Sequence, residues 1–415
     1  MEKTFMETPT TNPAAPPQPT PSYHELREVL WLFLRLGFTA FGGPAAHIAM
    51  MREEVVRRRH WISNERFVDL IGVTNLIPGP SSTELAIYLG YLQAGWPGLL
   101  VAGVCFIGPA MLIVLALAWA YVTYGALPQI GWLFYGIQPV VVAIVAQAIW
   151  NLGRTIFTGP LAVGLALVVL VCYFLGVNVL ILLLGGAALY GVLRLLISRR
   201  RTKTPVVSVA VPLLATNLRA DLQPLIARLG AGAVAAAPSV SLGLVFLTFL
   251  KLGSVVYGSG YTLLAFLRTD LVQNLHWLTD KQLLDAISIG QFTPGPVFTT
   301  ATFIGYVIGG WPAALLATLA MFLPSFALIA LIHPVASRLR QATWTATLLD
   351  GVNAAALALM TGVLVQLGQH ALTDILTVAI AILAFVILLR FKLNSVWLIL
   401  AGAVIGLLRF WIVGM

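Results

Sequence analysis

The sequence predicts an all-α polytopic membrane protein made of two homologous halves, and its composition and an internal repeat carry that prediction. Hydrophobic residues make up 59% of the 415 residues and charged residues only 9%, with a mean hydropathy of +0.93. Soluble domains carry about 25% charged residues, so that class is excluded. No alternating strand pattern is present, so we expect helices rather than a barrel. Stretches near the roughly 20 residues that cross a bilayer lie at 26–48, 98–124, 131–150, 160–176, 178–197, 241–266, 312–333, 347–368, 372–389 and 394–413.

The internal repeat is marked by the tripeptide Pro-Gly-Pro, which occurs at residues 78–80 and again at residues 294–296. Residues 35–80 align with residues 251–296 without a gap, and a single deletion after the second tripeptide extends the alignment. The chain is therefore two copies of one fold. Identical matched residues include Leu36/Leu252, Gly37/Gly253, Gly42/Gly258, Arg52/Arg268, His60/His276, Trp61/Trp277, Asp69/Asp285, Trp96/Trp311, Pro109/Pro324 and Gly136/Gly351.

This repeat divides the chain into four segments. Residues 1–24 are rich in Pro and Thr and lack the basic and apolar regions of a signal peptide, so we expect a disordered N-terminal tail. The first repeat is expected over residues 25–197 and the second over residues 241–415. Residues 198–240 contain several charges and prolines, which is typical of a cytoplasmic linker.

The cysteines and the net charge exclude several classes of site. Cys105 and Cys172 lie in apolar segments without a neighbouring Cys or His at ligand spacing, so neither a disulfide, a metal site nor a cofactor is expected. The net charge of +9 is gathered at segment ends. We therefore expect it to set the topology in the lipid bilayer rather than to bind nucleic acid.

The positions of the basic clusters predict the topology, because Lys and Arg are enriched in cytoplasmic loops. If the segments flanking each Pro-Gly-Pro (66–77 with 81–95, and 282–293 with 297–310) dip in and return, each half crosses five times. Every cluster is then cytoplasmic, and the second half is an inverted repeat of the first. If these segments cross as broken helices, the linker must add a span, so we expect about ten to thirteen transmembrane helices. The clusters are Arg52 with Arg57, Arg58 and Arg59, then Arg154, Arg199 to Arg201 with Lys203, Arg338 with Arg340, and Arg390 with Lys392.

Each Pro-Gly-Pro is expected to break a helix near mid-membrane. Proline fixes φ and lacks an N–H, so one half-helix ends there and another starts, with Pro80 or Pro296 at its first position. Unpaired N–H groups at such a helix start attract anions when they face a water-filled cavity. A tight turn between packed helices is the alternative, but breaks at matching places in two halves are typical of a transport site. The N–H groups belong to Ser81, Ser82, Thr83, Val297, Phe298 and Thr299.

A second repeated element places a cation inside an apolar span of each half. Arg35 and Lys251 occupy matched positions. Intramembrane charges usually face a cavity or a partner, so both are candidates for neutralising an anionic substrate. The alternatives are that they reach the interface or pair with an acid. The glycines that follow, Gly42 with Gly43 and Gly258, allow close approach of either a ligand or a second helix.

Three further sets of polar residues lie in or near the spans. Glu84 follows the first Pro-Gly-Pro without an acidic counterpart, and it is a candidate for proton coupling, for stabilising the helix start or for pairing with Arg35. Gln138 and Asn353 are matched amides that donate hydrogen bonds either to substrate or between helices. Asp69 and Asp285 follow polar residues, which favours a place in the first helical turn at an interface. The two His-Trp pairs, at 60–61 and 276–277, are expected to be interfacial anchors.

The motifs Phe41-Gly42-Gly43-Pro44, His60-Trp61 and Pro78-Gly79-Pro80, with their second-half counterparts, resemble the long, two-domain members of the chromate ion transporter family. The resemblance covers the chain from about residue 25 to the C-terminus. It implies a multi-pass protein of the cell inner membrane that exports chromate, a tetrahedral dianion similar to sulfate, and so confers chromate resistance. It also implies two homologous domains of opposite orientation.

These observations together predict a secondary transporter rather than an enzyme or an ATP-driven pump, because no Walker-type loop is present. Transport of sulfate or another oxyanion, and an anion channel, are the alternative functions, and a homodimer is one assembly that we consider. The candidate substrate-binding residues are Arg35, Lys251, Gly42, Gly43, Gly258, Pro78, Gly79, Pro80, Ser81, Ser82, Thr83, Pro294, Gly295, Pro296, Thr299, Gln138 and Asn353, and Glu84 is the candidate for proton coupling.

Overall fold

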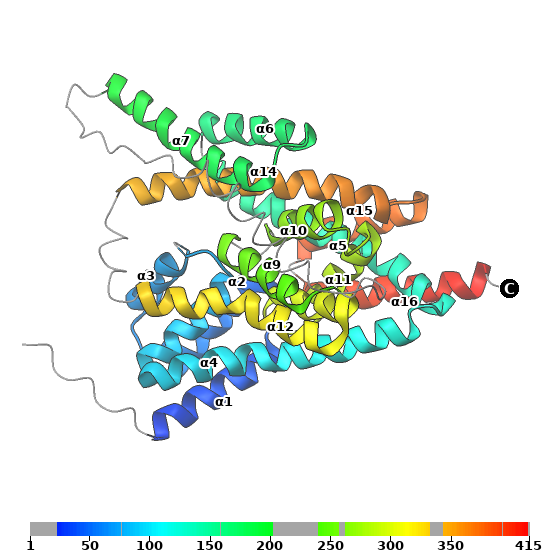
Figure 1. The fold of residues 1–415 in the computed structure, drawn as a ribbon, viewed down its shortest axis with the longest axis horizontal. Helices are drawn as coiled ribbons and strands as arrows, with labels where there is room; N and C mark the ends of the chain where they lie inside the picture. The colour runs from blue at the N-terminus through cyan, green and yellow to red at the C-terminus, as the bar shows by residue number, and fades with distance from the viewer. Residues whose placement is uncertain are drawn as a thin grey trace, which may run out of the picture.

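The computed structural model is helical throughout the part of the chain that it describes (Figure 1). The described residues are 23–75, 77–157, 159–201, 240–256, 262–332, 343–391 and 393–413. Several sequence predictions lie outside them: nearly all of the N-terminal tail and of the linker, the candidate residue Gly258, and the basic residues Arg338, Arg340 and Lys392.

The two halves contain matching helices in the same order, and the described part of the second half has one further short turn, η3. In the first half these are α1 (Tyr23–Thr39), α2 (Gly43–Arg52) with the π-helical turn η1 (Glu53–Arg58), α3 (Asn64–Thr74), α4 (Ser81–Tyr124), α5 (Pro128–Ile156), α6 (Pro160–Phe174) and α7 (Val179–Arg201). In the second half they are α9 (Leu242–Val255), α10 (Leu263–Leu267) with the π-helical turn η2 (Arg268–Asn274), α11 (Asp280–Phe292), η3 (Val297–Thr299), α12 (Thr300–Ile332), α14 (Thr343–Ala371), α15 (Ile375–Phe391) and α16 (Ser395–Val413).

The long helices α4 and α12 each reverse direction at an internal break. In α4 the break lies at Ala94 and Gly95, and in α12 it lies at Gly309 and Gly310. The last residue of each break has a positive φ, of +59° at Gly95 and +70° at Gly310. Gly90 lies against Gly98, although residues eight apart in a straight helix are separated by about 12 Å. The arm that follows each Pro-Gly-Pro therefore folds back along the longer second arm, which is the course of a re-entrant segment.

The two halves pack through their long helices, and the second arms of α4 and α12 run antiparallel. Gly103 of α4 contacts Phe326 in the second arm of α12, and further along α4 the ring of Tyr121 lies 5.1 Å from that of Phe303 in the first arm of α12. The fold-back holds this first arm against the start of the second, where Gly305 lies against Ala313. From one contact to the other, the second arm of α12 therefore runs towards lower residue numbers as α4 runs towards higher ones. The second arms of these two equivalent helices therefore run in opposite directions.

The last two helices of each half pack against the other half. Helix α5 contacts α15 and α16, and α14 contacts α6 and α7 (Figure 1). Small residues allow the close approach: Gly136 of α5 lies against Gly402 of α16, and its counterpart Gly351 lies against Ala187 of α7. Each half therefore completes the core of the other.

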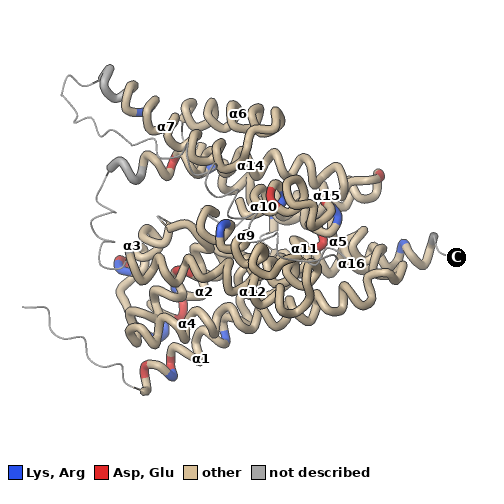
Figure 2. The backbone as a smooth tube through the Cα atoms, in the orientation of Figure 1, with Lys and Arg blue, Asp and Glu red and all other residues tan. Residues whose placement is uncertain are grey.

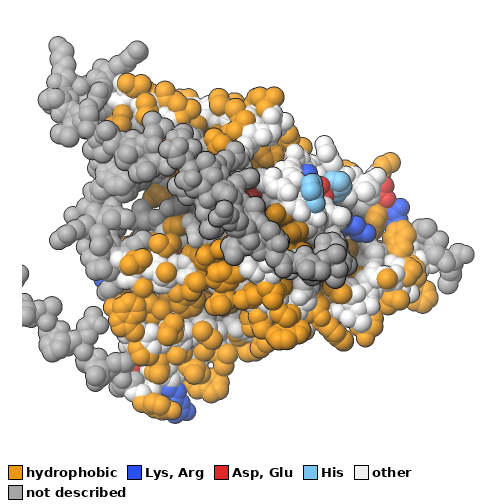
Figure 3. Space-filling view, in the orientation of Figure 1, with side chains coloured by type: hydrophobic (Ala, Val, Ile, Leu, Met, Phe, Trp, Pro, Cys, Tyr) orange, Lys and Arg blue, Asp and Glu red, His pale blue; other side chains and the backbone are white. Residues whose placement is uncertain are grey.

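The outer faces of the helices are apolar, as expected for a surface in contact with lipid. Leu100, Val104 and Leu112 are exposed along one face of α4, and hydrophobic side chains cover much of the visible surface in Figure 3. No Lys, Arg, Asp or Glu lies in α6 or α12. Figure 2 shows charged residues near the ends of several other helices. The chain is thus a multi-pass membrane protein. Six described helices are long and apolar enough to cross, at 81–124, 128–156, 179–197, 297–331, 347–371 and 395–412.

The exchanged packing predicts that Gly136→Ala destabilises the protein, because a Cβ at this position would overlap the carbonyl oxygen of Gly402. We expect a loss of about 1–3 kcal/mol, which is typical of overpacking, seen as a lower melting temperature of the detergent-purified protein. Gly131→Ala in the same helix is the control, since no atom lies within 4 Å of its added Cβ. Equal melting temperatures for the two variants would contradict the packing.

Candidate functional site

The two Pro-Gly-Pro breaks are joined across the halves by a reciprocal pair of hydrogen bonds. The N–H of Gly79 donates to the carbonyl of Val256 at 2.7 Å, and the N–H of Gly295 donates to the carbonyl of Ala40 at 2.8 Å. Ala40 and Val256 are matched residues at the ends of α1 and α9. The two breaks therefore share one central region, to which both halves contribute the same elements.

Glycine is required at the centre of each break. Gly79 has φ of +140° and Gly295 has φ of +88°, which side chains rarely tolerate. A Cβ on Gly295 would lie 2.7 Å from the Cβ of Ala110, and one on Gly79 would lie 2.6 Å from Ser325 Oγ and overlap Glu84. The breaks are consequently also points of close approach to helices α4 and α12.

The helix starts after the breaks correct one sequence prediction. Helix α4 and η3 start directly after Pro80 and Pro296. The N–H of Thr83 donates to the Pro80 carbonyl at 2.7 Å, and the N–H of Thr299 donates to the Pro296 carbonyl at 3.0 Å. The prediction that these two N–H groups are unpaired is wrong, because the first turn tightens into i→i+3 hydrogen bonds.

Glu84 is fully buried beside the first break. Its Oε1 accepts a hydrogen bond from Ser325 Oγ of the other half at 3.3 Å. Its Oε2 and the nearby Thr83 Oγ1 are buried without a hydrogen-bond partner among the described residues. Burying an unpaired polar atom is costly, so a proton or a ligand bound here would stabilise the site.

His47 adds a second buried polar group that the sequence predictions missed. Its Nε2 lies 3.1 Å from the Ala40 carbonyl and its Nδ1 lies 3.3 Å from Ser82 Oγ. In the arrangement that satisfies both contacts, Nε2–H donates to Ala40 and the Ser82 hydroxyl donates to Nδ1. The Ala40 carbonyl is therefore shared by His47 and Gly295, which couples His47 to the second break.

The second break has neither the acid nor the imidazole of the first at the matched positions. Thr299 and Thr300 donate their hydroxyl hydrogen bonds locally, to the carbonyls of Pro296 and Val297, each at 2.7 Å. The positions that match His47 and Glu84 hold Leu263 and Thr300. The central region is thus symmetric in its backbone and asymmetric in its side chains.

The two predicted cations are each paired with an acid at matched positions. Arg35 Nη2 lies 3.3 Å from Glu54 Oε1, and Lys251 Nζ lies 2.7 Å from Asp270 Oδ2. The acids are buried, whereas the side chains of Arg35 and Lys251 are 56% and 49% exposed. An anion that binds either cation has to compete with its carboxylate.

The predicted amide Gln138 binds an acid whose position was wrongly predicted. Gln138 Nε2 donates to Asp285 Oδ1 at 2.8 Å, and the hydroxyl of Tyr121 donates to Asp285 Oδ2 at 2.9 Å. Asp285 was expected at an interface, but it is buried in the second turn of α11, because that helix packs against α5 and α14. Asn353, the matched amide, lies half-buried on α14.

The glycines after Arg35 shape the chain between α1 and α2. Gly42 and Gly43 have φ of +103° and +76°, and Pro44 follows within the first turn of α2. The turn that they form lies just after Ala40, so it helps to hold the carbonyl of that residue towards Gly295.

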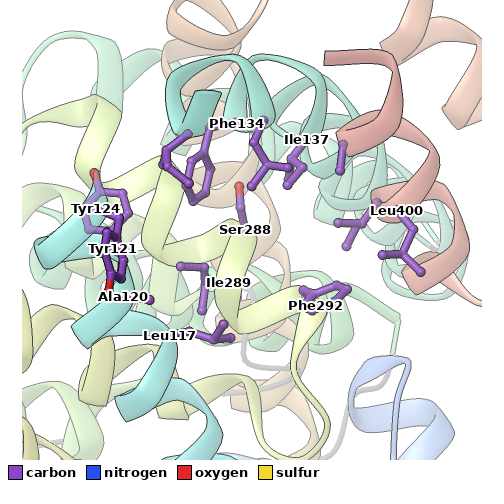
Figure 4. A pocket seen from close by; sticks show the side chains of 14 residues that line it. Leu117, Ala120, Tyr121, Tyr124, Phe134, Ile137, Ser288, Ile289, Phe292 and Leu400 are labelled. Atoms are coloured by element: carbon purple, nitrogen blue, oxygen red, sulfur yellow. The ribbon is translucent and has the colours of Figure 1, made fainter. Parts of the chain in front are cut away.

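A cavity of about 270 Å³ has none of the Pro-Gly-Pro residues in its lining, although Phe292, just before the second break, is part of it (Figure 4). Its walls come from α4, α5, α11 and α16, and they are almost entirely apolar, with Tyr121 and Ser288 as polar members. Such a lining suits an apolar molecule better than an oxyanion. The polar groups around Gly79 and Gly295 are therefore the stronger candidate for a transport site.

Comparisons with known proteins agree with the two-half architecture. A sequence model described as chromate transporter matches residues 27–192 and 243–407. The chain is 34% identical over 407 residues to the chromate transport protein of Cupriavidus metallidurans, with 97% of each chain covered. It is 32% identical to the chromate transport protein of Pseudomonas aeruginosa, over 97% of this chain and 95% of that protein. It is 31% identical to a probable chromate transport protein of Synechococcus elongatus, over 94% and 97%. No solved structure matches this chain.

The geometry of the first break predicts that Gly79→Ala is more harmful than backbone strain alone explains. We expect a loss of about 1–2 kcal/mol from the positive φ and about 1–3 kcal/mol more from the contact with Glu84 and Ser325. Gly176→Ala is the control for a positive φ without a close contact, because Gly176 has φ of +83° and no atom within 4 Å of an added Cβ. Thermal unfolding of both variants tests this, and equal losses would argue against the contact.

Proposed function

The chain belongs to the chromate transporter family, and we propose that it is a secondary transporter that moves chromate out of the cell across the inner membrane and so confers resistance. The observation that carries this proposal is the reciprocal bonding of the two Pro-Gly-Pro breaks. Interrupted helices at matching places in two halves are typical of a substrate site near the bilayer midplane. Family membership also indicates a transporter rather than an enzyme.

The substrate is proposed to bind between the breaks, in contact with residues from both halves. The unpartnered atoms of Thr83 and Glu84 support a ligand or a proton in this region. The other substrate-binding candidates from the sequence, which include Ser81 and Asn353, are proposed to line the same substrate site. Arg35 and Lys251 would neutralise a dianion when it displaces the carboxylates of Glu54 and Asp270.

Two oppositely oriented halves provide a route to alternating access. The antiparallel arms of α4 and α12 and the exchange of terminal helices support an inverted repeat. The fold-back of both long helices supports the topology with five crossings per half, at the low end of the range of about ten to thirteen. Rocking one half against the other would expose the central region to each side in turn.

The membrane potential can drive this export without a nucleotide. Moving a dianion out of a negative-inside cell gains about 2.3 kcal/mol per charge at 100 mV. Proteoliposomes with imposed voltage and pH gradients test the proposal directly. Voltage-driven chromate flux with counterflow supports a transporter, flux without counterflow indicates a channel, and flux of sulfate alone would replace chromate as the substrate.

The two cations should matter for transport. We expect Arg35→Gln and Lys251→Gln each to lower the rate of chromate flux about tenfold or more, because a charge-assisted hydrogen bond contributes about 1.5–3 kcal/mol. Arg194→Gln is the control, since Arg194 forms an exposed ion pair with Asp350 at 2.6 Å on α7 and α14. Wild-type flux in both test variants, at equal membrane levels, would remove these cations from the substrate path.

Glu84 is proposed to carry the coupling proton. Glu84→Gln should abolish the response of chromate flux to a pH gradient while voltage-driven flux persists, because the amide keeps the shape but cannot exchange a proton. Ser325→Ala removes the hydrogen-bond donor to Glu84 but leaves the acid, so it should keep the pH response. A pH response that survives in Glu84→Gln would show that another group carries the proton.

A further inference from the structure

The carboxylate of Glu54 lies at the centre of a cluster of three guanidinium groups. Arg58 Nη1 donates to Oε1 at 3.0 Å, Arg35 Nη2 lies 3.3 Å from the same oxygen, and Arg59 Nε lies 3.6 Å from Oε2. The side chain of Glu54 is 7% exposed, so it is held beneath the three cations. One carboxylate cannot compensate three positive charges, which leaves the cluster with two in excess.

The adjacent acid Glu53 does not remove this excess. Glu53 pairs with Arg57 at 3.2 Å and with Arg58 at 3.6 Å, so it brings one further carboxylate and one further guanidinium, Arg57, to the group. Arg59 also has an incomplete set of contacts: its Nε is buried without a hydrogen-bond partner among the described residues. A buried donor that lies 3.6 Å from the Glu54 carboxylate, too far for a hydrogen bond, and next to excess positive charge favours an anionic ligand.

The second half carries the same scaffold without the excess charge. Lys251, Asp270, Asn274 and Leu275 occupy the positions of Arg35, Glu54, Arg58 and Arg59. Lys251 Nζ binds both oxygens of Asp270, at 2.7 and 2.9 Å, and Asn274 Nδ2 lies 3.4 Å from Oδ1. One cation and one anion balance there. The additional guanidinium groups are therefore a property of the first half and not of the fold.

The local backbone holds these groups in place. Residues 53–58 form a π-helical turn, which often marks functional positions. The N–H of Arg59 donates to the Glu54 carbonyl at 3.0 Å and that of Trp61 donates to the Val55 carbonyl at 2.9 Å, which forces His60 to a φ of +52°. This turn brings the guanidinium of Arg59 to 5.7 Å from the centre of the Trp61 ring, where it can stack.

We propose that Arg35, Arg58 and Arg59 around Glu54 form a capture site for a tetrahedral dianion on the first half only. Guanidinium groups bind oxyanions through paired N–H donors, and two charges in excess match a dianion. Glu54 acts as a resident competitor that the dianion displaces and that returns when the dianion leaves. This inference rests on the proposed function for the identity of the dianion, and it adds a binding step before the central region.

The capture site and the second break share helix α1. Arg35 lies on α1, and the Ala40 carbonyl just after the end of this helix accepts the hydrogen bond of Gly295. A dianion held by Arg35 is therefore bound to the helix that leads to the second break. The basic cluster to which Arg57, Arg58 and Arg59 belong is predicted to be cytoplasmic, so capture would favour substrate from that side.

The test is equilibrium binding of radiolabelled chromate and sulfate to the purified full-length protein in nanodiscs of zwitterionic lipid. Arg58→Gln and Arg59→Gln should raise the Kd for both dianions about tenfold or more, since each removes a charge-assisted contact. Glu54→Gln should lower the Kd several-fold by removing the competitor, and the added dianion should raise its melting temperature more than that of the wild type. If Glu54→Gln does not fold, the two arginine variants decide.

Arg57→Gln is the matched control, because it removes the same charge from the same turn but Arg57 contacts Glu53 rather than Glu54. Its Kd should stay within about twofold of the wild type, since an exposed ion pair contributes little. An unchanged Kd in Arg59→Gln, or an equal loss in Arg57→Gln, would overturn the capture site. A headgroup phosphate that occupied the site would compete with the dianion, so dianion binding that anionic lipid abolishes would assign the site to lipid instead.

These outcomes separate the capture site from the proposed function. If the wild type transports chromate but its Kd for the dianions does not change in Arg59→Gln, the proposed function holds and the capture site is contradicted. If sulfate binding depends on Arg59 but the wild type transports no chromate, the capture site holds and the proposed function is contradicted.

Discussion

Each Pro-Gly-Pro tripeptide has a single backbone N–H, because proline has none, and that one donor is used to join the two halves. Gly79 donates to Val256 and Gly295 donates to Ala40. Within a bilayer an unpaired N–H costs several kcal/mol, so each break is stable only while the other half supplies its acceptor. The hydrogen bond from Ser325 to Glu84 joins the same two halves beside Gly79.

The symmetric backbone carries an asymmetric set of side chains. His47 and Glu84 lie at the first break, and the second break has Leu263 and Thr300 in their places. The same contrast separates the arginine cluster of Glu54 from the balanced pair of Lys251 and Asp270. If the central region opens to each side in turn, as proposed, these asymmetric groups make the two openings chemically different. Direction of transport would thus depend on side chains that a duplicated gene is free to change.

The parts of this architecture that depend on local sequence could be predicted from it. Pro-Gly-Pro breaks a helix wherever it occurs, and matched motifs expose the duplication, so the repeat and the two breaks were both evident. Contacts between distant segments were not. Glu54 and Asp270 meet Arg35 and Lys251 only because a π-helical turn sets their register against α1 and α9, and no sequence period marks that turn. Asp285 was misplaced for a similar reason, since its polar neighbours resemble those of an interfacial helix start.

The exchange of terminal helices has a consequence for synthesis of the chain. Helices α6 and α7 are made early, yet the helix that they pack against, α14, is made only after most of the second half. During that interval Gly186 and Tyr190 face lipid or a chaperone, and Arg194 has not yet met Asp350. The nascent first half is therefore inserted in the membrane with the faces of α6 and α7 that later contact α14 still uncovered. A ribosome that stalls beyond the linker leaves an insertion intermediate in which these faces stay accessible to quality-control proteins.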